Sequence, residues 1–266
     1  MIFSLLPASH KPSTIVLRIV TLLSLSMLAT ATFAVGGPPL ITDDPDTPGD
    51  GHWEINLVAI SQRSLSGKTI AIPDADINYG LGEHIMLKAD IPWTLAQQPG
   101  EERKSGPGFA NYGVKWRFID EEDVGYSVST YPQYAHSLTT ASINRGIAPA
   151  GGQFFLPLEV SGKVNEFDLD MEVGRNFVQN GPNQWEAGVV VGHECAKDVE
   201  CLIEIRKTLT GSEPGMAANS QTLLNLGFNW KLSESLTLLA AAGKEFGKQT
   251  PGQIQSLFYL GIQITR

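Results

Sequence analysis

Apolar and polar residues alternate with a period of two along most of the chain after residue 52. In "WEINLVAI", Trp53, Ile55 and Leu57 share one face, whereas Glu54 and Asn56 share the other. The same alternation recurs in "NYGVKWRF", "NEFDLDMEV" and "TLLNLGFNW". Successive side chains of a β-strand point to opposite faces, so this pattern predicts strands. No interior stretch of the expected mature chain reads as a long amphipathic helix or as a membrane-spanning one.

The alternating segments number about twelve, an even count that lets a sheet close with both chain ends at one rim. We expect strands at residues 53–62, 69–80, 84–94, 109–119, 124–134, 153–162, 165–177, 184–193, 199–209, 220–231, 235–244 and 255–265. The connections alternate between short ones, such as "GLGE" and "LSES", and long ones rich in Gly, Pro and Ser, such as "AQQPGEERKSGPG". Outer-membrane barrels have short turns on their periplasmic side and longer loops outside.

Two features favour a membrane barrel over a soluble β-sandwich, whose strands also alternate. The polar faces carry many charges, and the apolar faces carry aromatic residues close to the strand ends, where lipid-facing barrels place aromatic girdles. The tryptophans concerned are Trp53, Trp93, Trp116, Trp185 and Trp230. We therefore predict an all-β fold over residues 53–266: a transmembrane antiparallel up-and-down β-barrel of about 12 strands, surrounded by outer-membrane lipid.

The first 34 residues have the order of an export signal. Lys11 and Arg18 precede the apolar run "IVTLLSLSMLATATFA", and small residues between positions 29 and 34 offer cleavage sites. A membrane anchor helix is the alternative, but the apolar run is short and rich in Ser and Thr. The whole chain has 28 acidic and 19 basic residues. This acidic balance argues against nucleic acid as a partner, and export predicts an outer-membrane location.

The two cysteines, Cys195 and Cys201, lie in "HECAKDVECLIEI". In an oxidising compartment a pair this close in sequence can join a hairpin turn, so we expect a disulfide. A metal site that adds His193 and Glu194 would lack a recognisable ligand spacing. We therefore expect neither a metal nor a cofactor.

If the apolar face meets lipid, the opposite face lines a lumen. Acidic residues on that face outnumber basic ones, and such a lumen can be a solvated channel or can close on itself through ion pairs. The acidic positions are Glu54, Asp74, Asp76, Asp90, Glu159, Glu166, Asp168, Asp170, Glu172, Glu186 and Glu204, and the basic ones are Lys88, Lys115, Arg117, Lys163 and Arg206. A channel and a structural barrel with a filled polar lumen both remain open.

A rigid acidic segment, residues 35–52, precedes the first expected strand; we call it the lead-in. Its stretch "ITDDPDTPGDG" contains Asp43, Asp44 and Asp46 between prolines, and is too acidic and too interrupted to span a membrane. It can be a solvated tail, a calcium loop of unusual spacing, or a periplasmic plug. Because prolines stiffen it and the lumen bases Lys88, Lys115 and Arg117 offer partners, we expect the plug.

The stretch "PPLITDDPDTPGDGHWEIN", followed by "DINYGLGEHIMLKADIPW", covers much of residues 38–94. It resembles the start of the envelope family named for the meta-pathway of phenol degradation, a group of transporter-like outer-membrane barrels. The resemblance implies a barrel that passes small hydrophobic or aromatic compounds and is inserted by the barrel-assembly machinery. One departure is the carboxyl end, "IQITR", because such barrels commonly end on an aromatic residue and this chain ends on Arg266.

An outer-membrane lipid hydrolase is the enzymatic alternative. It needs a Ser and a His side by side with a third polar group. The nearest candidates, His136, Ser137, Ser142 and Asn144, lie in "HSLTTASIN", which has the composition of a loop. His136 and Ser137 would point to opposite faces of a continuing strand. We therefore expect a channel and no enzymatic activity.

Overall fold

The computed structural model describes residues 37–214 and 217–266; the expected signal peptide, residues 1–34, lies outside them. Within this described part, none of the helices is long and apolar enough to cross a membrane. The strands are β1 (Trp53–Ser64), β2 (Gly67–Leu81), β3 (Ile85–Gln97), β4 (Lys104–Pro107), β5 (Phe109–Ile119), β6 (Tyr126–Thr130), β7 (Gln133–Ser137), β8 (Gly152–Val164), β9 (Phe167–Val178), β10 (Gln184–Ala196), β11 (Val199–Thr210), β12 (Asn219–Ser233), β13 (Leu236–Gly247) and β14 (Ile254–Thr265). Two short helices, α2 (Glu121–Val124) and α3 (Thr140–Asn144), lie in the connections.

The strands form one closed antiparallel barrel. Each strand from β8 to β14 pairs with its neighbour in the chain, and β1 pairs with both β2 and β14. The ring closes where β3 pairs with β5 and where β6 and β7 both bridge β5 and β8. With β6 and β7 occupying one place in the wall and β4 attached only to β3, the barrel has 12 strands. The predicted fold class is confirmed.

Three details of the predicted strands are wrong. The strand expected at 124–134 is divided into β6 and β7 by Tyr131 and Pro132, because a proline has no N–H to donate to a sheet. The second half, β7, continues to Ser137, so His136 belongs to a strand and not to the expected loop. In addition, β4 forms within the long connection after β3, where no strand was expected.

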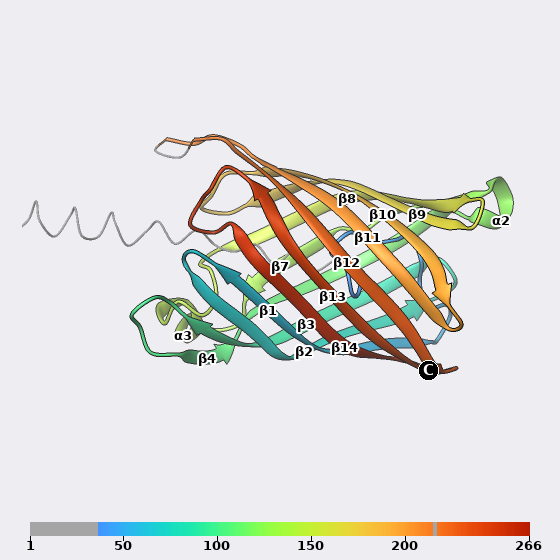
Figure 1. Ribbon diagram of the computed structural model, residues 1–266, viewed down its shortest axis with the longest axis horizontal. Coiled ribbons are helices and arrows are strands. Elements are labelled where there is room, and N and C mark those ends of the chain that lie inside the picture. The colour runs from blue at the N-terminus through green and yellow to red at the C-terminus, as the bar shows by residue number, and fades with distance from the viewer. Residues whose placement is uncertain (1–36, 215–216) are drawn as a thin grey trace, which may run out of the picture. The chain divides into compact units, whose positions relative to one another are not determined.

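The connections divide the barrel into a short-turn rim and a long-loop rim. At the short-turn rim, β8–β9 and β10–β11 are joined by two-residue turns in which Asn165 and Asp198 have positive φ, as tight hairpins require. The chain enters and leaves here, since Trp53 and Arg266 exchange backbone hydrogen bonds of 2.7 and 2.9 Å. Figure 1 shows α2 and the carboxyl end at this rim, and α3 and β4 at the other.

The outer face of the barrel is apolar. Its exposed side chains include Leu57, Ile203 and Leu260, and the five tryptophans named above are between 43% and 55% exposed. A wide exposed apolar surface of this kind is typical of the outer face of membrane β-barrels. In the ends of β10 and β11 that flank their turn, Cys195 and Cys201 form a disulfide with an S–S distance of 2.01 Å.

Candidate functional site

The described part of the lead-in, residues 37–52, runs from the short-turn rim into the lumen (Figure 1). It is first attached to the β2–β3 turn, where the Thr47 hydroxyl donates to the Glu83 carbonyl at 2.7 Å and Asp50 accepts from the backbone N–H of Gly82 at 2.9 Å. Farther in, Leu40 and Thr42 are buried. The lead-in therefore lies against the inner wall and not in the solvent outside the barrel.

Glu204 on β11 holds the inner end of the lead-in. This fully buried carboxylate accepts from the backbone N–H groups of Ile41, at 3.2 Å, and Thr42, at 2.6 Å. It also accepts from the Thr42 hydroxyl at 2.7 Å and from Asn225 on β12 at 3.2 Å. A carboxylate that accepts several N–H and O–H donors is satisfied without a cation, so Glu204 recognises the lead-in backbone itself.

Arg206, two residues farther along β11, organises the wall behind this contact. Its guanidinium pairs with Glu172 on β9 at 2.6 Å and with Glu186 on β10 at 2.7 Å. It also donates to the Thr42 hydroxyl at 3.3 Å. All three charged side chains are buried, and a planar guanidinium can satisfy two carboxylates at once. The network therefore joins β9, β10 and β11 to the lead-in.

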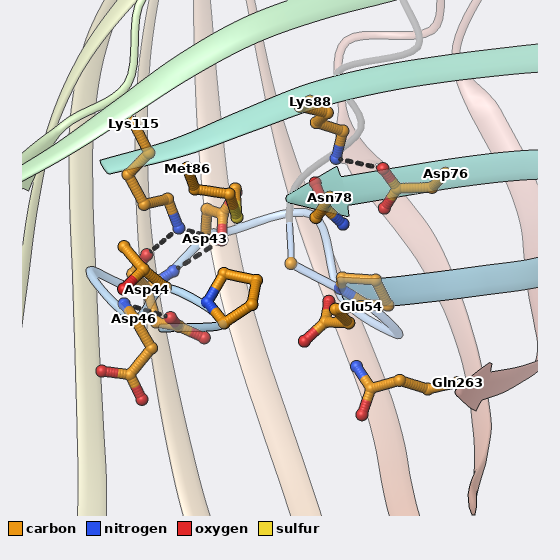
Figure 2. A pocket seen from close by; sticks show the side chains of 14 residues that line it. Asp43, Asp44, Asp46, Glu54, Asp76, Asn78, Met86, Lys88, Lys115 and Gln263 are labelled. Atoms are coloured by element: carbon orange, nitrogen blue, oxygen red, sulfur yellow. Dashed lines mark hydrogen bonds and ion pairs between the residues drawn. The ribbon is translucent and has the colours of Figure 1, made fainter. Parts of the chain in front are cut away.

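Lys115 on β5 holds the acidic part of the lead-in. Its ammonium lies 3.0 Å from the Asp43 carboxylate and donates to the Asp44 carbonyl (Figure 2). It also lies 3.7 Å from Glu159 on β8. The ring of Tyr131 lies beneath the same ammonium, 4.8 Å from it to the ring centroid. Lys115 is therefore surrounded by partners from three parts of the chain.

The other two bases that were expected to bind the lead-in, Arg117 and Lys88, do not hold it as Lys115 does. Arg117 lies 3.6 Å from Asp46, but the Asp46 side chain is 79% exposed, so this pair contributes little. Lys88 on β3 pairs with Asp76 on β2 at 3.1 Å (Figure 2) and not with the lead-in.

Glycines on the inner wall let the lead-in approach closely. A Cβ atom at Gly188 on β10 would lie 1.8 Å from the Thr42 hydroxyl oxygen, and one at Gly80 on β2 would lie 1.8 Å from the Gly49 carbonyl oxygen. No side chain fits into such a space, so these positions need glycine as long as the lead-in is docked.

The remaining predicted lumen residues divide by depth. Glu54, Arg117, Asp168 and Asp170 are half-buried near the short-turn rim, and Lys163 and Glu166 are exposed there. Fully buried on the inner face are Asp74, Asp76, Lys88, Asp90, Lys115, Glu159, Glu172, Glu186, Glu204 and Arg206. In the lead-in, burial raises the pKa of Asp44 from 3.8 to about 7, and the nearby Lys115 opposes this shift.

One side of the lumen is apolar, although the alternation along the chain predicts a polar inner face. Inward-facing residues of β1, β2, β12 and β14 form one cluster, against which Ile41 of the lead-in packs, and residues of β10, β11 and β13 form a second one with Leu40. The wall residues are Val58, Ile60, Ala71, Leu223, Ile254 and Leu257 in the first cluster, and Val190, Leu202 and Ala241 in the second. Unbroken apolar runs such as "LVAI" at 57–60 and "VVV" at 189–191 are the signal for strands that are apolar on both faces.

Two cavities flank the lead-in. One, of about 180 Å³, lies between the lead-in and β1–β3 and is lined by Glu54, Asn78, Lys88 and Lys115 among others (Figure 2). The other, of about 300 Å³, lies towards β8–β12 and includes Asp168 in its lining. Both include Asp44 and Asp46, so the lead-in divides the space inside the short-turn rim.

The hydrolase candidates do not form a catalytic arrangement in the structure. The Ser137 and Ser142 hydroxyls donate to the backbone carbonyls of Thr139 and Pro107, at 3.1 and 2.7 Å. The His136 ring nitrogen bonds the Ser137 carbonyl at 3.0 Å, and the ring lies beside two tyrosines. Within residues 37–214 and 217–266, no three His, Cys, Asp or Glu side chains are placed to hold a metal ion.

No protein-family model matches this chain, and no curated protein matches its sequence. The fold is similar to that of solved outer-membrane channels. An outer-membrane channel from Pseudomonas putida F1 superposes with a TM-score of 0.66 at 10% identity, covering 84% of this chain and 98% of that one. The NanC porin has a TM-score of 0.55 at 6% identity, and the KdgM porin 0.54 at 10%; each covers 79% of this chain and 98% of its own. The chain thus has the fold of an outer-membrane β-barrel of the channel and porin type.

Proposed function

We propose that this protein is an outer-membrane channel for small hydrophobic or amphipathic compounds and that the docked lead-in closes it at rest. In this proposal a signal peptide exports the chain, the barrel-assembly machinery inserts it, and the lead-in faces the periplasm. The chain then belongs to the envelope family that its amino-terminal motif resembles.

The observation that carries the proposal is that a separate segment, and not the strands alone, fills the lumen at the short-turn rim. Its polar contacts include hydrogen bonds and ion pairs to Glu204, Arg206 and Lys115, all of which can be broken without disturbing the barrel ladder. Glu159 lies 3.7 Å from Lys115, so this lysine keeps a carboxylate partner when Asp43 leaves. In a state of the barrel without the lead-in, Lys115 would therefore not be a buried charge without a partner.

The two-sided lumen supports the proposed solute class. The apolar clusters beside Leu40 and Ile41 face the charged side that contains Lys88, Asp90 and Lys115. A purely aqueous pore gains nothing from buried Val and Leu on its inner wall, whereas an amphipathic solute finds an apolar surface on one side and hydrogen-bonding groups on the other. The apolar wall therefore supports passage of compounds that carry an aromatic or aliphatic part.

A structural barrel with a filled polar lumen is the second candidate. It is favoured by the buried ion pairs of Arg206 with Glu172 and Glu186, which occupy the inner face of the adjacent strands β9, β10 and β11 and need no carboxylate of the lead-in. In that case removing the lead-in opens no continuous path.

Planar-bilayer conductance separates these two functions. Deletion of residues 38–50 should raise the conductance several-fold in protein that still migrates as a heat-modifiable barrel. Gly188→Ala should act in the same direction, because its Cβ meets the Thr42 side chain. Gly192→Ala is the matched control on the same strand, since its Cβ meets the flexible end of Glu200 at 2.7 Å. Unchanged conductance in both the deletion and Gly188→Ala would support the filled structural barrel instead.

A further inference from the structure

The cavity of about 180 Å³ beside the lead-in carries more negative than positive charge (Figure 2). Two lysines line it, and each already has a carboxylate: Lys88 pairs with Asp76 at 3.1 Å and Lys115 with Asp43 at 3.0 Å. The five carboxylates of the lining are Asp43, Asp44, Asp46, Glu54 and Asp76. The cavity therefore has a surplus of acceptors and a deficit of cations.

Two of these five carboxylates, Asp44 and Glu54, exceed the number of cations that line the cavity. Asp46 reaches out of the cavity towards Arg117, whereas Asp44 and Glu54 form no ion pair with any residue that the structure describes. Glu54 accepts from the Asn56 amide at 3.2 Å, and Asp44 from the backbone N–H of Asp46 at 2.7 Å. Each carboxylate oxygen has more than one lone pair, so both groups can accept further hydrogen bonds.

Asn78 supplies an independent indication of a ligand. It lies on β2 directly between Glu54 on β1 and Lys88 on β3, it lines the cavity, and it is only 2% exposed. Its amide oxygen has no hydrogen-bond partner within the described residues. A buried amide oxygen cannot be satisfied by taking up a proton, as a carboxylate can, so it requires a donor.

From this arrangement we propose that the cavity binds a small organic cation with several N–H donors, such as a primary ammonium or a guanidinium. Its donors are shared among the Asp44 and Glu54 carboxylates and the Asn78 amide oxygen. The acceptors are spread over the lead-in and two strands and do not converge on one point, and no described group of three acidic, His or Cys side chains is placed for a metal ion. A group with several directed N–H bonds suits this spacing better than a bare ion.

The site would also connect ligand binding to the position of the lead-in. One side of the cavity is formed by the lead-in, and β1–β3 contribute most of the other. The lead-in residues are Gly37, Pro38, Asp43, Asp44, Asp46, Thr47 and Pro48. The complete site exists only while the lead-in is docked, so a bound cation stabilises the docked position. The proposal concerns equilibrium binding and does not depend on whether the barrel conducts.

The test is calorimetric titration of the full-length protein in detergent micelles with ethylammonium, at low salt and about pH 8, where Asp44 is ionised. Saturable binding is expected. Tetramethylammonium, which has the same charge and no N–H, should bind at least about ten-fold more weakly, because it cannot donate hydrogen bonds. Equal binding of the two cations would overturn the proposal, and so would displacement of ethylammonium by a lower concentration of Mg²⁺.

Substitutions locate the site. Glu54→Gln and Asn78→Leu should each weaken ethylammonium binding about ten-fold or more. Glu54→Gln keeps the shape of the side chain, so it tests the site even if Asn78→Leu does not fold. Asp168→Asn is the matched control, since it removes the same charge from the lining of the other cavity. If Asp168→Asn weakens binding as much as Glu54→Gln, the attraction is a diffuse effect of net charge and the proposed site is wrong.

Discussion

Thr42 and Glu204 lie 162 residues apart in the chain, yet the backbone N–H and the hydroxyl of Thr42 both donate to the same carboxylate oxygen of Glu204, at 2.6 and 2.7 Å. Glu204 is fully buried, and its remaining partners are the Ile41 backbone and Asn225. One side chain of the wall thus determines where the inner end of the lead-in lies.

Replacing Glu204 by Leu should release the lead-in. The change leaves the Ile41 and Thr42 donors unpaired in a buried site, at a cost of about 1–3 kcal/mol for each lost bond. We expect higher single-channel conductance and faster proteolytic cleavage within residues 38–50. Glu200→Leu on the same face of β11 is the control, because Glu200 accepts from Asn229 and does not contact the lead-in through a hydrogen bond. An equal effect of both substitutions would argue against a specific role for Glu204.

Neutralising the lead-in aspartates should have unequal effects. Asp43→Asn breaks an ion pair whose two side chains are only 2% and 7% exposed, whereas Asp46→Asn affects one in which Asp46 is 79% exposed. The first should raise conductance at any salt concentration, since buried charges are weakly screened. The second should have a small effect that disappears at high salt. Conductance measured from low to about 1 M salt distinguishes the two, and the reverse ranking would contradict the docked geometry.

Docking of the lead-in should weaken as pH rises. Burial raises the pKa of Asp44 to about 7, against 3.8 in a solvated segment. The docked form therefore binds the Asp44 proton more tightly than the undocked form does. Between about pH 4 and about pH 7 the undocked carboxyl is ionised while the docked one is still protonated, so docking becomes less favourable as pH rises through this window. We expect conductance to rise over this window and to level off above it. Asp44→Asn should flatten the profile; an unchanged profile would assign the dependence to another group.

Arg206 should be far more important for stability than an exposed base of the same barrel. Arg206→Met leaves Glu172 and Glu186 buried without a cation and should cost about 3–5 kcal/mol of unfolding free energy. Lys163→Met is the control, since its pair with Asp168 at 2.9 Å is exposed to solvent and should contribute little to stability. Urea unfolding in detergent, followed by tryptophan fluorescence, measures both. Similar losses for the two variants would contradict a buried network.

The disulfide between Cys195 and Cys201 should stabilise the β10–β11 hairpin modestly. It closes a loop with a sequence separation of only 6, so replacing both cysteines by Ser should cost about 2 kcal/mol. Mass spectrometry of unreduced peptides from envelope preparations should find the two joined. Two reactive thiols in that material would refute the bridge.

The alternation along the chain was enough to predict the barrel. A period of two assigns each side chain to a face by backbone geometry alone, so Trp53 and Leu57 were placed outside and Glu54 inside from neighbouring residues only. The even strand count placed both ends at one rim, where Trp53 and Arg266 in fact pair. The break at Tyr131 and Pro132 was missed because the alternation continues through it, although a proline inside a predicted strand was the available warning.

The partners across the lumen were decided only by the tertiary structure. From the sequence, Lys88, Lys115 and Arg117 were equally good partners for the lead-in. Closure of the barrel places Lys115 beside Asp43. Lys88 pairs instead with Asp76, its diagonal neighbour on the adjoining strand. The apolar inner wall and the space over Gly188 likewise depend on which distant strands face one another. Alternation is a local property of the backbone, whereas these contacts join residues far apart in the chain, whose distances are fixed only when the register of every strand is set and the ring is closed.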